Sequence, residues 1–153
     1  MKYSLVLVVA AMMFNSCQNK RNKESKTDLK SEHALVSGSI KSYDYSSLAP
    51  LLNRKDDKTY VVNFWATWCK PCVEELPAFE KLNKNYKDKN VEVLLVSLDF
   101  PDEVTGKLLP FLKEHKIASH VVLFDDPNQD VWISKINEDW SGALPATLIY
   151  NAS

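Results

Sequence analysis

The chain has 153 residues and a formal net charge of −1, from 19 Lys and Arg against 20 Asp and Glu. That length suits one domain, and an apolar content of 45% is enough for a hydrophobic core. The balanced charge argues against a partner made of nucleic acid, because proteins that bind one usually carry a basic excess. Three cysteines are too few for a disulfide-dense scaffold.

The N-terminus has the pattern of an export signal. A positive charge precedes the unbroken apolar run 5–14, and the small residue Ser16 closes the segment. The run is too short for a membrane-spanning helix, which needs about 20 apolar residues. Cys17 directly after Ser16 resembles the lipobox of bacterial lipoproteins, although Phe14 stands where that motif usually has Leu. We expect residues 1–16 to be a lipoprotein-type signal peptide; the alternative is a plain signal peptide in which Cys17 is incidental.

A polar segment follows. Between positions 18 and 32 basic and acidic residues are mixed, and Leu29 is the only aliphatic side chain. No apolar face runs through this stretch, so it cannot bury enough surface to fold. We therefore expect lipidation at Cys17, a flexible tether over 17–38, and a domain over 39–153. The protein would then be lipid-anchored in the cell envelope of a bacterium.

The body of the chain alternates strands and helices. Strand-like segments are rich in β-branched and aromatic residues, and helix-like segments repeat apolar residues at helical spacing. This alternation predicts an α/β fold, a parallel or mixed sheet with helices on both faces. We expect Pro77 to kink its helix and Pro110 to bend or split its own. The predicted elements are a short helix around 48–52, strand 59–65, helix 70–88, strand 91–98, helix 103–116, strand 121–124, helix 128–136 and strand 146–150.

A pair of cysteines lies where the first predicted strand meets its helix, in Trp68-Cys69-Lys70-Pro71-Cys72. Two cysteines at this spacing on a helix start can form a disulfide with little backbone movement. The helix dipole and the unpaired N–H groups favour the thiolate of Cys69, and Lys70 adds a positive charge. We predict that Cys69 is the attacking nucleophile and Cys72 the resolving thiol.

Two other interpretations of the pair remain open. A structural zinc site also uses Cys-x-x-Cys, but it needs two further ligands. Cys17 lies at the far end of the tether, and His115 and His120 do not have the spacing of a ligand pair. A structural disulfide without turnover is the other alternative. We expect no metal and no cofactor beyond the redox-active disulfide Cys69–Cys72.

Three segments of the sequence match a known pattern: residues 61–72, Glu75-Leu76-Pro77 and Leu144-Pro145-Ala146-Thr147. Through them the sequence resembles the thioredoxin superfamily, and within it the TlpA/ResA-type membrane-tethered thiol-disulfide oxidoreductases, from about residue 39 to the end. The resemblance implies a thioredoxin-like fold, a mixed sheet flanked by helices with a central insertion. It also implies exposure to the periplasm or at the cell surface, and exchange or reduction of disulfides in exported proteins.

The resemblance also implies roles for single residues. Pro145 matches the family's cis-proline, which packs against the active-site disulfide; the alternative is an ordinary trans proline at the start of a strand. We predict substrate contacts at Trp68, Pro71, Leu144 and Pro145. The tryptophans Trp65 and Trp68 are expected to pack around the site as core residues. Of the other two, Trp132 lies in the insertion, and Trp140 lies close enough to the cis-proline to face substrate.

Glu75 is a candidate for proton transfer. On a helix of 100° per residue it falls inside the apolar stripe, one turn past Cys72, whereas Glu74 falls outside it. A carboxyl group there could exchange a proton with Cys72. The alternative is a surface Glu75 that the Pro77 kink turns outward. Asn63 stands where cytosolic thioredoxins have a buried Asp. TlpA/ResA-type proteins usually have Asn at this position, so the resemblance leaves proton transfer to Glu75.

The end of the chain departs from the family pattern. That pattern has a further antiparallel strand and a final helix after strand 146–150, but the sequence stops at Ser153. We expect this C-terminal strand and helix to be missing, which would expose a sheet edge. The sequence is then either an incomplete fragment of a longer protein, which we favour, or an unusually short domain.

The leading functional hypothesis is a reductase of disulfides in exported proteins, acting through a mixed disulfide. A membrane electron donor would then re-reduce the pair, because the envelope is oxidising. By family analogy alone, apocytochrome c is a plausible client, which would place the protein in cytochrome c biogenesis. The alternatives are a periplasmic disulfide donor, a peroxidase and a non-enzymatic thioredoxin-fold binding domain. A peroxidatic cysteine usually lacks a Cys-x-x-Cys partner, which counts against the peroxidase.

Overall fold

The computed structural model describes residues 40–152. The predicted signal peptide, Cys17 and the tether lie outside the described residues. Between residues 40 and 152, no helix combines the length and the apolar character that a membrane span requires.

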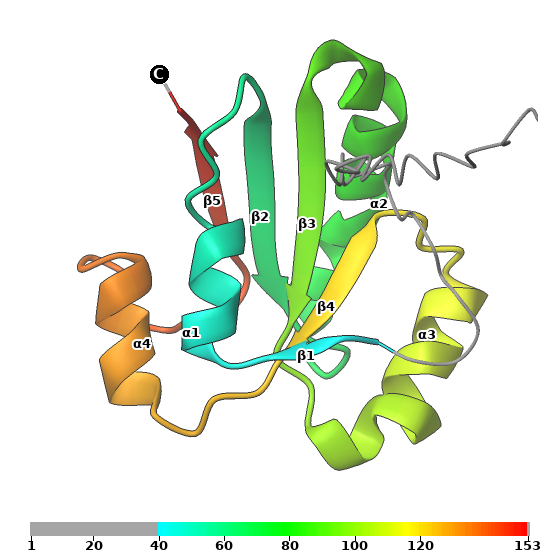
Figure 1. The fold of residues 1–153 in the computed structure, drawn as a ribbon. Helices are drawn as coiled ribbons and strands as arrows, with labels where there is room; N and C mark the ends of the chain where they lie inside the picture. Colours follow the sequence, from blue (N-terminus) through cyan, green and yellow to red (C-terminus); the bar gives the residue numbers. More distant parts are fainter. Residues whose placement is uncertain (1–39, 153) are drawn as a thin grey trace, which may run out of the picture. The chain divides into compact units, whose positions relative to one another are not determined.

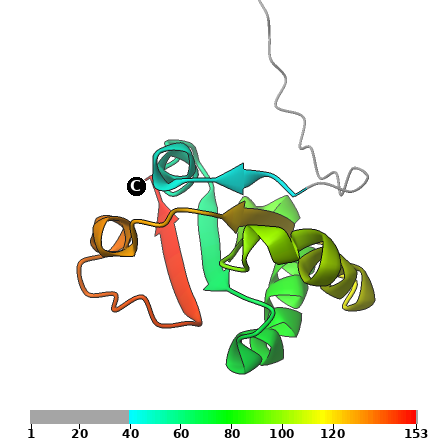
Figure 2. The ribbon, with the colours of Figure 1, turned by 90° about the horizontal axis from the view of Figure 1, so that it is seen from below.

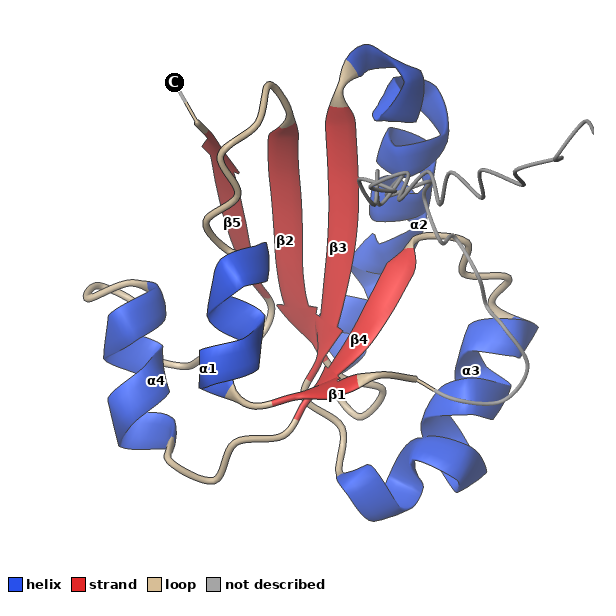
Figure 3. Ribbon diagram, in the orientation of Figure 1, coloured by secondary structure: helices blue, strands red, loops and turns tan. Residues whose placement is uncertain are grey.

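A five-stranded sheet in the order β1-β4-β3-β2-β5 forms the centre of the fold (Figures 1 and 3). The first four strands in that order run parallel, and β5 is antiparallel to β2. The bounds are Ser42–Tyr43 for β1, Thr59–Trp65 for β2, Val91–Ser97 for β3, His120–Phe124 for β4 and Ala146–Asn151 for β5.

Strands β2 and β3 are the central pair. They run in register from Thr59 beside Val91 to Trp65 beside Ser97, and both become fully buried toward their carboxyl ends. Parallel strands covered on both faces need nearly continuous apolar runs, and both segments have them. The predicted strand 59–65 is confirmed to the residue.

The helices cover both faces of the sheet (Figure 2). Helices α2 and α3 pack on the face that carries Val61, Val93 and Leu95, while α1 and α4 pack on the opposite face. Alternate residues of β2 thus enter two separate hydrophobic clusters. The helix bounds are Tyr45–Leu48 for α1, Lys70–Tyr86 for α2, Leu109–Glu114 for α3 and Gln129–Ile136 for α4.

The predicted helix 103–116 is divided, which is one of the two effects expected of Pro110. The chain instead forms a 3₁₀ turn over Pro101–Glu103, a π-helical turn over Val104–Leu108 and then α3. Pro110 lies in the first turn of α3, where its missing N–H costs no helical hydrogen bond. The split that Pro110 was expected to cause is therefore present. Pro77, by contrast, lies inside α2, which continues through it to Tyr86.

The observed fold is the thioredoxin-like mixed sheet that the sequence predicts. Helix α3, strand β4 and helix α4 lie between β3 and β5 in the chain, where the central insertion was expected. Strand β4 extends the sheet beside β3, and the two-residue β1, which the sequence pattern did not predict, adds to its outer edge.

Strand β5 forms the other edge of the sheet. Its residues alternate between half-buried and exposed positions. Ala146, Leu148 and Tyr150 pack into the cluster under α1 and α4. On the face shared with α2, Ile149 remains 65% exposed. Among the described residues no strand pairs with the outer edge of β5.

Candidate active site

The two cysteines lie at the start of α2 and form a disulfide, with their Cα atoms 5.3 Å apart. Cys69 is the N-cap residue, with extended backbone geometry, and Pro71 lies in the first helical turn. The N–H of Cys69 donates to Ala66 O at 3.1 Å, and the N–H of Val73 donates to Cys69 O at 3.1 Å. A tight turn therefore carries the chain from the end of β2 directly into the helix.

Burial separates the two cysteines. Cys69 retains 7% of its surface and Cys72 none. An incoming disulfide therefore reaches Cys69 first, where the N-terminal N–H groups of α2 stabilise a thiolate. A zinc site would need further ligands, and among residues 40–152 no three His, Cys, Asp or Glu side chains gather as metal ligands would.

Lys70 lies on the surface beside the pair. Its ammonium group is 3.9 Å from the carboxylate of Glu74, and its side chain is 88% exposed. Solvent and the carboxylate both screen this charge, so Lys70 contributes less to the Cys69 thiolate than the helix terminus does. Glu74 is exposed, as the helical pattern predicted.

Glu75 points toward the sheet and bonds to Asn63, which is completely buried. The Asn63 amide donates to Glu75 Oε1 at 2.8 Å and to Thr147 Oγ1 at 3.2 Å. Glu75 is half-buried, which places it on the inner side of α2 rather than on the outward side that was the alternative. The amide joins α2, β2 and β5 one helical turn below the disulfide.

The loop before β5 approaches the cysteines. The Leu144–Pro145 peptide bond is cis, as the resemblance implies, and Leu144 packs against the cluster that contains Cys69 and Cys72. Since Ala146 pairs with Phe64 in the antiparallel register, Pro145 lies next to the end of β2. Leu144 and Pro145 are both half-buried, whereas Pro71 is exposed.

The tryptophans differ from one another in burial. Trp65 is fully buried, as predicted. The expectation that Trp68 packs in the core is wrong, since 57% of it is exposed; it lies in the turn past the end of β2, beyond the cover of the helices. Trp140 packs against Phe64 with ring centroids 4.9 Å apart, and its indole N–H donates to Ala143 O at 2.9 Å, so its ring belongs to the core rather than to the substrate surface.

A buried acid that the sequence analysis did not select holds the same turn. Both oxygens of Asp99, which follows β3, accept the Thr67 N–H at 3.1 Å. Asp99 is 2% exposed. The available signal was its position, because an acid just after a strand parallel to β2 must lie near the end of β2 and thus near the cysteines.

A family model identifies the chain's relatives. The model of the AhpC/TSA family matches residues 38–153. The chain belongs to this family. The predicted likeness to the thioredoxin superfamily and its ResA type is confirmed by this match together with the relatives described next.

One curated relative and two solved structures illustrate the similarity. The thiol-disulfide oxidoreductase ResA of Oceanobacillus iheyensis is 32% identical over 107 residues, which are 69% of this chain and 55% of the relative. The structure of a thioredoxin-related protein from Neisseria meningitidis serogroup B superposes with a TM-score of 0.52 at 30% identity, over 61% of this chain and 66% of the other. A thiol:disulfide interchange protein from Chlorobium tepidum TLS shares the fold, with a TM-score of 0.52 at 23% identity, over 69% of this chain and 68% of the other.

The match covers only part of the curated relatives. The chain spans about half the length of the Oceanobacillus iheyensis ResA protein. The matched part contains the whole strand–turn–helix that carries the two cysteines, so the similarity bears directly on this site.

Proposed function

We propose that this protein is a thiol-disulfide oxidoreductase that reduces disulfides in exported proteins. The observation that carries the proposal is the cysteine pair at the start of α2, in which Cys69 is partly accessible and Cys72 is fully buried. This asymmetry assigns attack to Cys69 and resolution to Cys72.

The reaction transfers two electrons from the dithiol to the client. The Cys69 thiolate attacks one sulfur of the client disulfide, the client S–S bond breaks, and the other client sulfur leaves as a thiolate. Cys72 then loses its proton and attacks Cys69 Sγ. The Cys69–Cys72 disulfide forms, the client is released as a dithiol once its two sulfurs are protonated, and a donor dithiol must reduce the enzyme again.

Glu75 is the proposed proton acceptor for Cys72. It lies one helical turn past Cys72 on the inner side of α2, and its bond to Asn63 limits its side-chain freedom. Deprotonation of a fully buried thiol needs a nearby base, because water does not reach Cys72.

The client is proposed to lie across the surface formed by Trp68, Pro71, Leu144 and Pro145. Trp68 and Pro71 are exposed on either side of Cys69 in the chain. The loop before β5 contributes Leu144 and Pro145, which lie next to the carboxyl end of β2. An extended client segment fits this arrangement, because backbone pairing along the loop needs no particular client sequence.

The proposed location follows from the N-terminal sequence. A lipid on Cys17 would anchor the domain in the bacterial cell envelope, facing the periplasm, and would bring it near a membrane electron donor. Replacing Cys17 by Ser in the full chain tests the anchor: the protein should move from the membrane fraction to the soluble fraction. If the variant stays in the membrane fraction, the proposal of a lipid anchor at Cys17 is wrong.

A trapping experiment tests the mechanism. In the full chain, Cys72→Ser should accumulate mixed disulfides between Cys69 and client proteins, because the resolving thiol is gone. Cys69→Ser is the matched control and should trap nothing. Capture of the same partners by a variant that lacks both cysteines would contradict the proposed enzymatic function and would favour a non-enzymatic binding domain.

The direction of electron flow needs its own measurement. Acid quenching followed by thiol alkylation in cells reports whether Cys69 and Cys72 are reduced at steady state. A mostly reduced pair is expected for a reductase that a donor supplies with electrons. A mostly oxidised pair together with client trapping would indicate the disulfide donor instead.

A further inference from the structure

Asp99 is a buried acid surrounded by hydrogen-bond donors. Besides the Thr67 N–H, it accepts the Thr67 hydroxyl and, at 2.7 Å, the Ser97 hydroxyl. Its own N–H donates to Ser97 Oγ at 3.1 Å. Donors therefore face both oxygens, which is the arrangement that a carboxylate requires in a buried position.

The position of Asp99 connects it to the disulfide. Thr67 lies within the turn that the Cys69 N–H closes on Ala66, two residues before Cys69. Two residues span at most about 7 Å, so the carboxylate lies close to the start of α2. Its contacts hold the turn that places Cys69 at the helix terminus.

We infer that Asp99 is a positioning residue for Cys69 and that its negative charge opposes the Cys69 thiolate, which makes the dithiol a stronger reductant. The inference rests on the proposed function. A thiolate stabilised by the helix terminus favours the reduced form and makes the disulfide more oxidising. A fixed negative charge beside that terminus acts in the opposite sense.

The other charged groups around Cys69 cannot take this role. On α2, Lys70 and Glu74 form a solvent-exposed pair, and Glu75 is directed to Asn63. The loop 140–145 carries no charged residue. In the segment leading to α3, Glu103 pairs with Lys107, whose side chain is exposed. Asp99 is thus the one fully buried carboxylate bonded to the turn, within the part of the chain that the structure describes.

Asp99→Asn in the full chain tests the inference. Asn retains one acceptor for Thr67, and the Ser97 and Thr67 hydroxyls can turn to accept from its new NH₂ group. Removing the charge should raise the Cys69 thiolate fraction at a given pH roughly threefold to tenfold. The rate of Cys69 alkylation against pH measures that fraction. The equilibrium with glutathione should shift toward the dithiol by a similar factor at pH 8 and by less at pH 5.

Two further variants separate charge from structure. Asp102→Asn removes an exposed charge three residues away and should change neither measurement. Thr67→Val keeps the Asp99 charge while removing one of its donors, so the thiolate fraction should stay the same or fall. If both substitutions acted only by loosening the turn, the Cys69 thiolate fraction would change in the same direction in Thr67→Val and in Asp99→Asn.

The outcomes are decisive in either direction. An unchanged alkylation profile and glutathione equilibrium in Asp99→Asn would overturn the inference, as would an equal rise in Thr67→Val. If Asp99→Asn does not fold, a higher Cys69 thiolate fraction in Thr67→Val overturns the inference, whereas an unchanged or lower fraction supports it. Client trapping by Cys72→Ser is independent of these results, so failure of the inference leaves the proposed function standing.

Discussion

Asn63 donates a 2.8 Å hydrogen bond to Glu75, and this contact joins the central strand of the sheet to the helix that carries both cysteines. The same amide nitrogen reaches Thr147 on β5. The side-chain oxygen of Asn63 is buried and has no hydrogen-bond partner among residues 40–152. An Asp at this position would place a second carboxylate against Glu75, whereas the amide supplies the donor that a carboxylate needs.

Replacing Glu75 by Gln should slow the resolving step. Gln keeps an acceptor for Asn63 but cannot take a proton from Cys72, so we expect decay of the mixed disulfide to slow roughly tenfold to hundredfold. Single-turnover reduction of a disulfide peptide, with the mixed disulfide followed by mass spectrometry, measures this rate.

Glu74→Gln is the matched control for that experiment. Glu74 is exposed and its carboxylate lies 3.9 Å from the Lys70 ammonium group, so its loss should leave the decay rate unchanged. Equal slowing in both variants would show that helix charge, rather than a proton acceptor, sets the rate.

Trp68→Ala should weaken action on protein clients without weakening the fold. Because the Trp68 side chain is largely exposed, the free energy of unfolding should change by less than about 0.5 kcal/mol. We expect kcat/KM for a protein disulfide to fall roughly fivefold to tenfold, since exposed aromatic residues supply much of the binding energy at interfaces. Reduction of a small disulfide should be unaffected.

Tyr86→Ala serves as the comparison for Trp68. Tyr86 is also an exposed aromatic residue, but it lies at the far end of α2. Its loss should leave kcat/KM unchanged for both substrates. If the two variants lose activity to the same extent, Trp68 has no special role in client binding.

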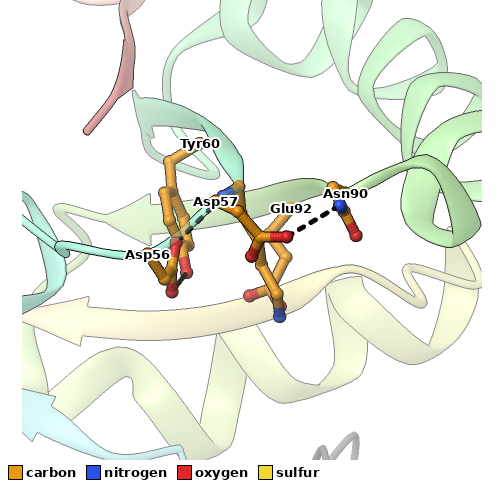
Figure 4. A network of polar contacts seen from close by, with 6 residues as sticks. Asp56, Asp57, Tyr60, Asn90 and Glu92 are labelled. Atoms are coloured by element: carbon orange, nitrogen blue, oxygen red, sulfur yellow. Dashed lines mark hydrogen bonds and ion pairs between the residues drawn. The ribbon is translucent and has the colours of Figure 1, made fainter. Parts of the chain in front are cut away.

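A polar network lies around the amino ends of β2 and β3 (Figure 4). The Tyr60 hydroxyl donates to Asp56 at 2.7 Å, and Asn90 donates to Asp57 at 3.1 Å. Burial, and then the Asp56 carboxylate, raise the pKa of Tyr60 to about 12. The same hydrogen bond lowers the pKa of Asp56.

The raised pKa of Tyr60 predicts a loss of stability in alkali. Between pH 10 and 12 the unfolded chain ionises this tyrosine while the folded chain keeps its proton, so the free energy of unfolding falls as the pH rises. Tyr60 contributes up to about 2 kcal/mol to that fall. In Tyr60→Phe, urea unfolding should show a shallower decrease between pH 10 and pH 12 than in the unchanged chain.

A part of the alkaline decrease should remain in Tyr60→Phe. Burial also raises the pKa of Tyr150, whose ring stacks on Tyr60 with centroids 5.1 Å apart. An identical slope with and without the Tyr60 hydroxyl would contradict the prediction. At pH 7 the variant should lose roughly 1 kcal/mol, because the hydrogen bond to Asp56 is gone.

Two aliphatic substitutions compare the core with the open sheet face. Leu95 on β3 is completely buried, whereas Ile149 on β5 is largely exposed. Leu95→Ala should destabilise the domain by about 2–5 kcal/mol, and Ile149→Thr should stay within about 0.5 kcal/mol. Denaturant unfolding of the full chain measures both. A large effect at Ile149 would mean that this face is covered in solution.

The sequence predicted the central elements of this fold because their signals are local. A run of β-branched and aromatic residues defines β2, and the cysteine pair with Pro71 marks the start of α2. The position of Glu75 on the inner side of α2 followed from helical spacing alone. Each of these patterns is contained within a few consecutive residues.

The features that escaped prediction depend on contacts between distant segments. The bond between Asp99 and Thr67 spans 32 positions, and the two residues of β1 form a strand only because β4 lies beside them. The exposure of Trp68 depends on which helices cover the turn, and no local pattern reports that. The break before α3 had a local cause in Pro110, but no local pattern predicted the π-helical turn over Val104–Leu108.

The outermost strand, β1, is the part of the domain that a pull on the preceding chain detaches most easily. Strand β1 is held to β4 and the loop that follows it by few backbone bonds, among them Leu123 N–H to Lys41 O at 3.0 Å and Asp125 N–H to Tyr43 O at 2.8 Å. A pull on the chain ahead of residue 41 breaks these bonds one after another, because the force acts at one end of a very short strand. The load then reaches α1, on the sheet face opposite α2, so the helix that carries the cysteines is not on the first path of the force. We expect such a pull in a single-molecule experiment to detach β1 at low force while Cys69 and Cys72 remain reactive.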